Sequence, residues 1–93
     1  MDENGLVVGE NDPEAQAAFI LKKIGKALDQ AGASLSDVVR TRMFITDPAH
    51  QDSVGRAHAV VFAQVRPAAT MVVVAGLVDP RLLVEIEGDA YTG

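Results

Sequence analysis

The chain has 93 residues, of which 48% are hydrophobic and 23% charged, a composition typical of one globular domain rather than of a disordered segment. The net charge of −5 and the aromatic content of 4% disfavour a nucleic-acid-binding protein, because such proteins rely on basic surface and aromatic stacking. The absence of cysteine excludes disulfides, thiolate metal sites and a cysteine nucleophile, and no stretch reaches the ~18 apolar residues of a membrane span.

The first third of the chain predicts a strand-like segment and a helix. Residues 5–9, Gly-Leu-Val-Val-Gly, are compatible with a short strand or the end of one. Asp12 can cap a helix and Pro13 suits its first position, while Gly32 is a typical residue just beyond a helix end. Between them, apolar residues recur every three or four positions, which is the pattern of an amphipathic helix. They are Ala17, Ile20, Leu21, Ile24, Ala27, Leu28 and Ala31.

The rest of the chain predicts a strand, a helix and two strands, with a short capped turn at residues 34–37 before them. Residues 38–46 alternate as a strand does. One face would carry Val39, Thr41, Met43 and Ile45, and the other Val38, Arg40, Arg42 and Phe44. The pair at 47–48, Asp-Pro, starts a second helix that should end near residues 66–67, Arg-Pro. Residues 70–77 and 82–90 predict the last two strands, separated by a turn at residues 78–81.

The predicted order is therefore (β)-α-β-α-β-β, an α+β fold in which two helices cover one face of a single sheet. Residues 70–77 are apolar on both faces of their strand, so the second face also needs cover. The mean hydropathy of +0.16 is high for so small a domain. We therefore expect a single domain over residues 1–93 that associates with another subunit.

Several motifs along the chain match those of a known family. The longest is AGASLSDVV at residues 31–39, at the entry to the first long strand. Shorter matches are Gln16 on the first helix, Thr46-Asp47 after the strand, Val61-Phe62 at the end of the second helix, Pro67-Ala68, Leu77, and VEIE at residues 84–87. Together they resemble the Rid family, also called YjgF-like, and the resemblance covers nearly the whole chain, from about residue 5 to residue 90.

This resemblance implies a chorismate-mutase-like α+β fold with a mixed sheet, and a homotrimer with pockets at its subunit interfaces. The best-known family members hydrolyse reactive enamine and imine intermediates made by pyridoxal-phosphate enzymes. Older names of the family are endoribonuclease L-PSP and translation inhibitor. No cofactor of its own is expected for this chain.

The resemblance also implies a site of which this chain keeps only part. The glutamate that positions the attacking water corresponds to Glu85. The arginine that binds the substrate carboxylate is replaced by Ala69, an asparagine of the second helix by Gly55, and a frequent cysteine by Met71. Because Met1 lies just ahead of the segment at residues 5–9, we also expect the first hairpin of the family to be missing.

Structural alternatives exist for the charged candidates. Glu85 could be a solvated strand residue paired with Arg40 or Arg42. We favour both arginines as partners of Glu85 or Glu87 over a cationic patch for an anionic ligand. Arg66 lies three residues from Ala69 and hence on the opposite side of an extended chain, which disfavours it as a substitute for the missing arginine.

His58 is a further candidate for the pocket, but a half-buried histidine packed near Phe62 is the favoured interpretation. No metal site is expected, because neither a second histidine nor a cysteine joins His58 at workable spacing.

The leading functional expectation is binding or hydrolytic deamination of a small reactive enamine or imine at a subunit interface. Because Ala69 cannot grip a carboxylate as arginine does, we expect weak or absent activity on imines of ordinary amino acids. The alternative is a non-catalytic ligand-binding or protein-interaction member of the family, and RNA cleavage is disfavoured by the charge. A cytoplasmic location is expected, because residues 1–4 are acidic and lack the basic start of a signal peptide.

Overall fold

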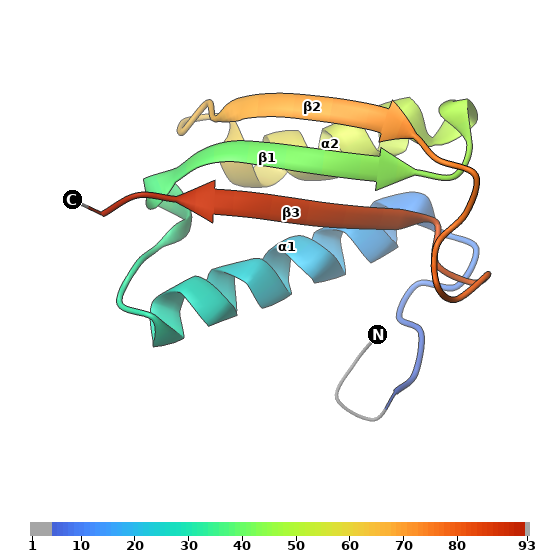
Figure 1. Ribbon diagram of the computed structural model, residues 1–93, viewed down its shortest axis with the longest axis horizontal. Helices are drawn as coiled ribbons and strands as arrows, with labels where there is room; N and C mark the ends of the chain where they lie inside the picture. The colour runs from blue at the N-terminus through green and yellow to red at the C-terminus, as the bar shows by residue number, and fades with distance from the viewer. Residues whose placement is uncertain (1–4, 93) are drawn as a thin grey trace.

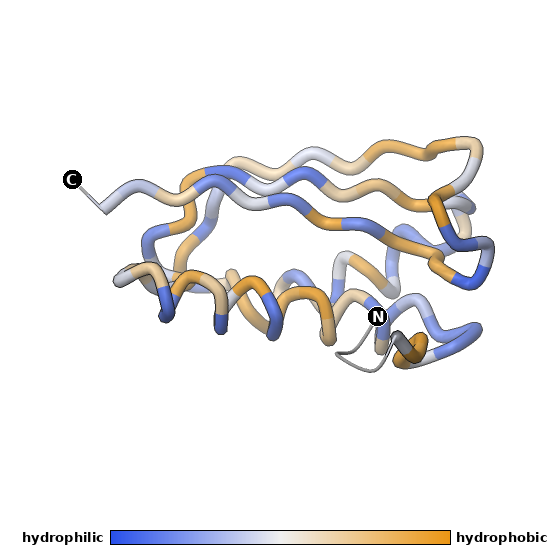
Figure 2. Tube along the Cα trace, turned by 60° about the horizontal axis from the view of Figure 1, so that its bottom comes forward, coloured by the Kyte–Doolittle hydropathy of each residue, from blue (hydrophilic) through white to orange (hydrophobic). Residues whose placement is uncertain are grey.

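The computed structural model describes residues 5–92, which form two helices and a three-stranded sheet (Figure 1). In chain order the elements are α1 (Pro13–Gln30), β1 (Val38–Ile45), α2 (Gln51–Phe62), β2 (Ala68–Val73) and β3 (Val84–Ala90), with short 3₁₀ turns at Leu35–Asp37 and Pro48–His50. Both helices lie on the same side of the sheet, and among the described residues no layer covers the other side (Figure 2). The predicted α+β class with two helices on one face is confirmed.

The sheet is mixed, as the resemblance implied. The strand order is β2-β1-β3, and β1 runs parallel to β2 and antiparallel to β3. Within residues 5–92, β2 and β3 are therefore edge strands and β1 is paired on both sides.

The predicted start and stop signals of α1 are confirmed. The Asp12 side chain accepts a hydrogen bond from the Ala15 main-chain N–H at 3.0 Å, and Pro13 is the first helical residue. Gly32, with φ +82°, has the left-handed conformation that glycine adopts at no steric cost just after a helix. Asp47 likewise accepts from the Ala49 N–H at 2.8 Å, which fixes the turn that leads into α2.

The core lies between the helices and the near face of the sheet. Its side chains come from both helices, α1 and α2, and from the positions of β1 and β3 that face them. Fully buried side chains include Leu21, Ile45, Val54 and Val84. On β3, Val84 and Ile86 are buried while Glu85 and Glu87 are exposed, so the predicted alternation is confirmed there.

The predicted grouping of faces is wrong at the start of β1. Val39 was grouped with Thr41, Met43 and Ile45, but Val38 is buried with those residues and Val39 is 53% exposed. The pairing with β3 has a register irregularity between Val38 and Arg40, and a bulge of this kind shifts the alternation by one residue. The prediction that Thr41, Met43 and Ile45 share one face is correct, and that face is the buried one.

Four predictions about the extent of the elements were wrong. Residues 5–9 form turns instead of a strand, because Gly5 and Gly9 have φ of +76° and +73°, which an extended strand does not allow. The third strand is Ala68–Val73 instead of residues 70–77, and the last begins at Val84 instead of residue 82. Helix α2 ends at Phe62, four residues before the predicted stop, and Arg66 has φ +55°.

Candidate functional site

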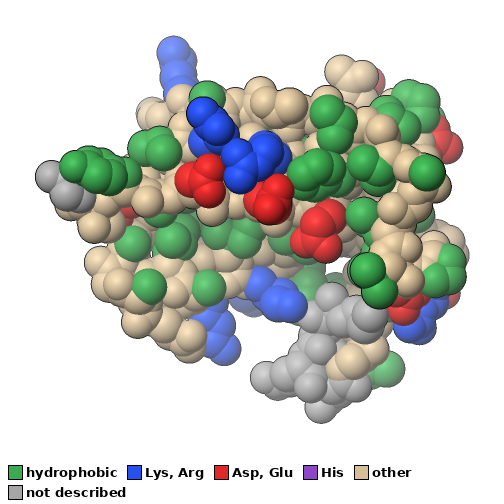
Figure 3. Space-filling model, in the orientation of Figure 1, with side chains coloured by type: hydrophobic (Ala, Val, Ile, Leu, Met, Phe, Trp, Pro, Cys, Tyr) green, Lys and Arg blue, Asp and Glu red, His purple; other side chains and the backbone are tan. Residues whose placement is uncertain are grey.

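The side of the sheet turned away from the helices is the first candidate surface, and we call it the open face. It carries three cross-strand rows, each with one residue from β2, β1 and β3. The rows are Ala68–Arg40–Asp89, Thr70–Arg42–Glu87 and Val72–Phe44–Glu85. Basic and acidic side chains therefore gather over β1 and β3 (Figure 3), while the β2 positions of the rows carry uncharged residues.

Arg42 organises the charges of the open face. Its Nε donates to Glu87 Oε1 at 3.3 Å, and its Nη2 lies 3.4 Å from Asp89 Oδ2. The hydrogen bond to Glu87 and the charge of Asp89 raise the pKa of Arg42. The predicted pairing of this arginine with Glu87 is confirmed. Neither Arg40 nor Glu85 forms an ion pair with another residue of the described chain.

Glu85 thus lies opposite Phe44 on the open face, with Arg42 already bound elsewhere. Residue 85 is also among those that line a cavity of about 360 Å³ between α1 and β3, on the side of the sheet opposite to the one that carries its side chain. The exposed carboxylate opposite Phe44 is available to a ligand, because it forms no ion pair with a residue of the described chain.

The other predicted site residues lie near the opposite edge of the sheet. Gly55 and Met71 line an open groove between α2 and β2. Met71 pairs with Met43 and packs against the core, and Ala69 pairs with Thr41, so both β2 residues belong to the helix side of the sheet. A Cβ added at Gly55 would meet no atom within 4 Å, so a larger residue would fit there.

The His58 side chain contacts two residues of the same chain, Thr41 and Phe62. Its Nε2 is 2.8 Å from Thr41 Oγ1, and its ring centroid is 4.7 Å from that of Phe62. Thr41 is 1% exposed, and burial lowers the pKa of the His58 imidazole. This is the packing position that the sequence favoured.

One chain therefore does not bring Glu85 and Ala69 together. They lie on opposite faces of the sheet and on its two edge strands, with β1 between them. A pocket that used both would need two copies of the chain.

Gln16 was missed as a key residue, although its motif was noted. It is 3% exposed, its Nε2 donates to the carbonyls of Gly9 (3.2 Å) and Arg81 (3.0 Å), and its Oε1 accepts from the Leu83 N–H at 2.7 Å. A signal was present, since Gln16 precedes Ile20 by four residues and so occupies the apolar face of the helix.

The cavity between α1 and β3 is largely apolar, and we call it the α1–β3 groove. Its walls are Val8, Gln16, Phe19, Ile20, Lys23, Ile24, Ala27, Leu82, Val84, Glu85 and Ile86. The groove runs beside the edge of β3 that no strand of the described residues pairs with.

A family model described as Endoribonuclease L-PSP matches residues 1–92. The chain belongs to this family, which is also known as the Rid or YjgF/YER057c/UK114 family. The crystal structure of Rv2704, a member from Mycobacterium tuberculosis, has a TM-score of 0.86 and 48% identity, covering 92% of this chain and 74% of that one. The Rid family protein YyfA from Yersinia pestis has a TM-score of 0.83 and 37% identity, covering 89% of this chain and 66% of that one.

Two curated relatives are 38% identical. The uncharacterized protein SCO2049 of Streptomyces coelicolor matches over 95% of this chain, and the 3-aminoacrylate deaminase RutC of Acinetobacter baylyi over 98%. The chain spans 66% of the length of the first protein and 71% of the second.

This Rid family chain shows no cluster of three or more metal-binding side chains in the part that the structure describes. Over the same residues, neither helix has the length and apolarity needed to cross a bilayer.

Proposed function

We propose that this Rid family chain forms a homotrimer whose interface pockets bind small neutral or cationic metabolites of the enamine or imine class. Hydrolytic deamination would be weak. The observation that carries the proposal is Glu85: an exposed carboxylate on the open face, opposite Phe44 and without an ion pair to any described residue.

Two features support assembly. The open face has no covering layer within residues 5–92, and Val72 on it is 41% exposed. In addition, Glu85 and Ala69 lie on opposite faces of one subunit, so a pocket built from both is possible only between copies. A neighbouring subunit would supply the β2–α2 edge with Ala69, Met71 and Gly55 opposite Glu85.

The proposed reaction is the addition of water to a C=N carbon. Glu85 would orient the water and accept one of its protons while the oxygen bonds to the carbon. The resulting carbinolamine then collapses: Glu85 returns the proton to the nitrogen, the C–N bond breaks and ammonia leaves, and the hydroxyl oxygen gives its proton back to Glu85 as the C=O bond of the carbonyl product forms. RutC, at 38% identity, is named for deamination of 3-aminoacrylate, which lends support to this reaction class.

The position of Ala69 supports a ligand without a carboxylate. Burying an unpaired carboxylate costs several kcal/mol, and a methyl group offers no charge to offset that cost. Glu85 would instead attract a positively charged nitrogen, such as that of an iminium. Ligands that are neutral or cationic are therefore preferred over free amino-acid derivatives.

The second candidate is a member of the family that binds a ligand or a protein without catalysis. Ala69 and Gly55 favour it, because both positions lack the polar groups that the family resemblance implies. RNA cleavage, suggested by the family description, is disfavoured by the net charge of −5.

A coupled assay tests the proposal. 2-Iminopropionate, generated in situ and trapped by semicarbazide, should be hydrolysed slowly by the wild-type chain, and Glu85→Gln should abolish the residual rate. Glu10→Gln, a neutral change at an exposed loop residue, is the matched control and should keep it. Equal rates with and without wild-type protein would leave the non-catalytic candidate, whereas turnover unaffected by Glu85→Gln would exclude Glu85 as the residue that orients water.

A further inference from the structure

Helix α2 contains a glycine that the packing of the subunit does not require. Gly55 lies inside this helix of 12 residues, where glycine is destabilising relative to alanine. A Cβ added at Gly55 would meet no atom within 4 Å. Gly25 of α1 differs, because a Cβ there would lie 3.1 Å from Leu35 Cδ1. Close packing therefore accounts for Gly25, whereas at Gly55 the sequence keeps a space open beside the helix.

This space belongs to the groove between α2 and β2, which we call the α2–β2 groove. Its volume is about 530 Å³, and it is lined by Gln51, Asp52, Gly55, Arg56, Ala59 and Met71. Ala69 lies two residues before Met71 on the same side of β2, and its side chain ends at a methyl group. Because an apolar cavity of ~150 Å³ can already hold a benzene ring, the groove has room for a ring with a substituent.

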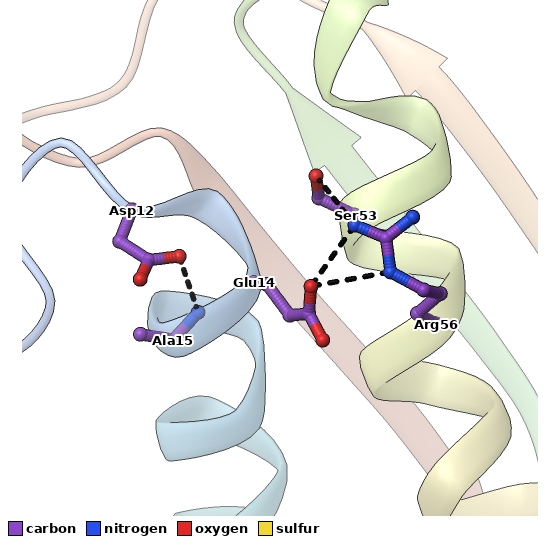
Figure 4. Close-up of polar contacts among 5 residues, drawn as sticks. All are labelled: Asp12, Glu14, Ala15, Ser53 and Arg56. Carbon is purple, nitrogen blue, oxygen red and sulfur yellow. Dashed lines mark hydrogen bonds and ion pairs between the residues drawn. The ribbon is translucent and has the colours of Figure 1, made fainter.

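The two charged side chains of the α2–β2 groove have roles within the subunit. The guanidinium of Arg56 is directed to Glu14 Oε1 and Ser53 Oγ (Figure 4). Asp52 lies in the first turn of α2, where the helix dipole stabilises a carboxylate. Neither charge therefore requires an oppositely charged group on a ligand.

The remaining surface of the groove is apolar. It consists of the bare helix backbone at Gly55, the methyl group of Ala59 and the half-buried side chain of Met71. A methionine thioether is polarisable and makes favourable contacts with aromatic rings. A helix turn without a side chain offers a ring a surface that it can approach closely. These residues thus favour a flat apolar group over a polar one.

We propose that the α2–β2 groove is a specificity subsite that accepts an aromatic substituent of the ligand, with the ring against Gly55 and Met71. The inference rests on the proposed function, because it names the substrate class of the same pocket: aromatic amines and their imines are preferred over short aliphatic ones. Gly55 sets the size of the subsite, and Met71 provides the apolar contact. All the groups that line the subsite belong to one subunit.

Two amines that differ by one phenyl ring test the ligand class. Benzylamine and methylamine both carry one positive charge at pH 7, and each is titrated against the full chain by NMR. We expect benzylamine to bind at least about tenfold more tightly, because only benzylamine buries a ring. The ring current should shift the methyl signal of Met71 more than that of the buried Met43. Equal affinities, or a larger shift at Met43, would overturn the proposal.

Filling the groove from the helix side tests the role of Gly55. Gly55→Leu should reduce the preference for benzylamine over methylamine to less than about threefold. Because leucine is a better helix former than glycine and would meet open space, the variant should be at least as stable to urea as wild type. Gly76→Leu is the matched control: a Cβ there also meets no atom within 4 Å, and Gly76 does not line the groove. It should keep the preference.

Three results with Gly55→Leu would overturn the proposal. A retained preference would place the ring elsewhere, lower stability would mean that subunit packing needs the glycine, and dissociation of the assembly in sedimentation would mean that a neighbouring subunit fills the groove. The 2-iminopropionate assay separates this inference from the proposed function. Turnover that depends on Glu85, without a preference for benzylamine, would contradict the subsite alone, whereas a preference without turnover would leave the non-catalytic candidate with an aromatic ligand.

Discussion

The Leu83 N–H donates to Gln16 Oε1 at 2.7 Å, which joins the start of β3 to the first turn of α1 across 67 positions of sequence. The Nε2 of the same Gln16 side chain donates to the carbonyls of Gly9 and Arg81. One buried side chain therefore connects α1 to the loop before it and to the segment before β3. Gln16→Ala would leave a donor and two acceptors without their partner. We expect the free energy of unfolding to fall by about 2–3 kcal/mol in urea titrations. Gln30→Ala, at the exposed end of α1, should change it by less than about 0.5 kcal/mol.

The ion pair between Glu14 of α1 and Arg56 of α2 should contribute little to the stability of the fold (Figure 4). Arg56 Nη2 and Nε lie 3.0 and 3.2 Å from Glu14 Oε1, and Nη2 also donates to Ser53 Oγ at 3.3 Å. Because both side chains are about half exposed, a double-mutant cycle with alanine should give a coupling energy of only about 0.5 kcal/mol. Raising NaCl to 1 M should reduce it, and a coupling insensitive to salt would contradict an ionic origin.

Acidification should destabilise the chain through His58. Burial lowers the pKa of its imidazole from 6.5, so the unfolded chain binds the proton more readily than the folded one. The contribution of neutral His58 is therefore complete above about pH 6.5 and is lost as the pH falls through that value toward the folded pKa. Urea midpoints measured from pH 7.5 to 5 should fall more steeply for wild type than for His58→Gln, and parallel curves would show that His58 is not responsible.

The proposed trimer depends on the open face. Val72 lies in the row of Phe44 and Glu85, so Val72→Asp would place a charge where a neighbouring subunit packs. We expect sedimentation equilibrium to show trimers for wild type and monomers for Val72→Asp at micromolar concentration. Val60→Asp, at an 85% exposed position of α2, should remain trimeric. A wild-type chain that sediments as a monomer would exclude the assembly.

Restoring the missing arginine should change the preferred ligand. Ala69→Arg adds a guanidinium that can bind a carboxylate in two parallel hydrogen bonds. We expect pyruvate, a stable carboxylate analogue, to raise the melting temperature of Ala69→Arg and not that of wild type, whereas small amines should favour wild type. Ala63→Arg, an exposed change after α2, controls for added charge. If pyruvate also raised the melting temperature of wild type, another cation would have to reach the site.

Much of the fold follows from local chemistry that a sequence displays. Asp12 with Pro13, and Asp47 with the proline that follows it, cap helices through their own side chains, so these starts were predictable. The alternation on β3 was equally visible, because one face packs on the core and the other meets water. The bulge at Val38 was not predictable, since a strict period of two contains no information on an inserted residue.

The candidate site was predictable only as a set of residues. Glu85, Ala69, Met71 and Gly55 came from family motifs, and motifs do not state which face of the sheet or which edge each residue occupies. Gln16 had a local signal, a polar side chain in the apolar stripe of α1, but its partners lie in two separate segments, Gly9 before the helix and Arg81 with Leu83 far along the chain. Only the folded arrangement brings them to one point.

The central place of β1 also has a kinetic consequence. Strand β1 is hydrogen-bonded to β2 on one side and to β3 on the other, so its main-chain groups do not lie at an edge of the sheet. Amide protons in the middle of β1 should exchange with deuterium only when the whole subunit opens. Proteases that need an extended segment would meet the edge strands first, and the rate at which β1 becomes cleavable would report the lifetime of the native state.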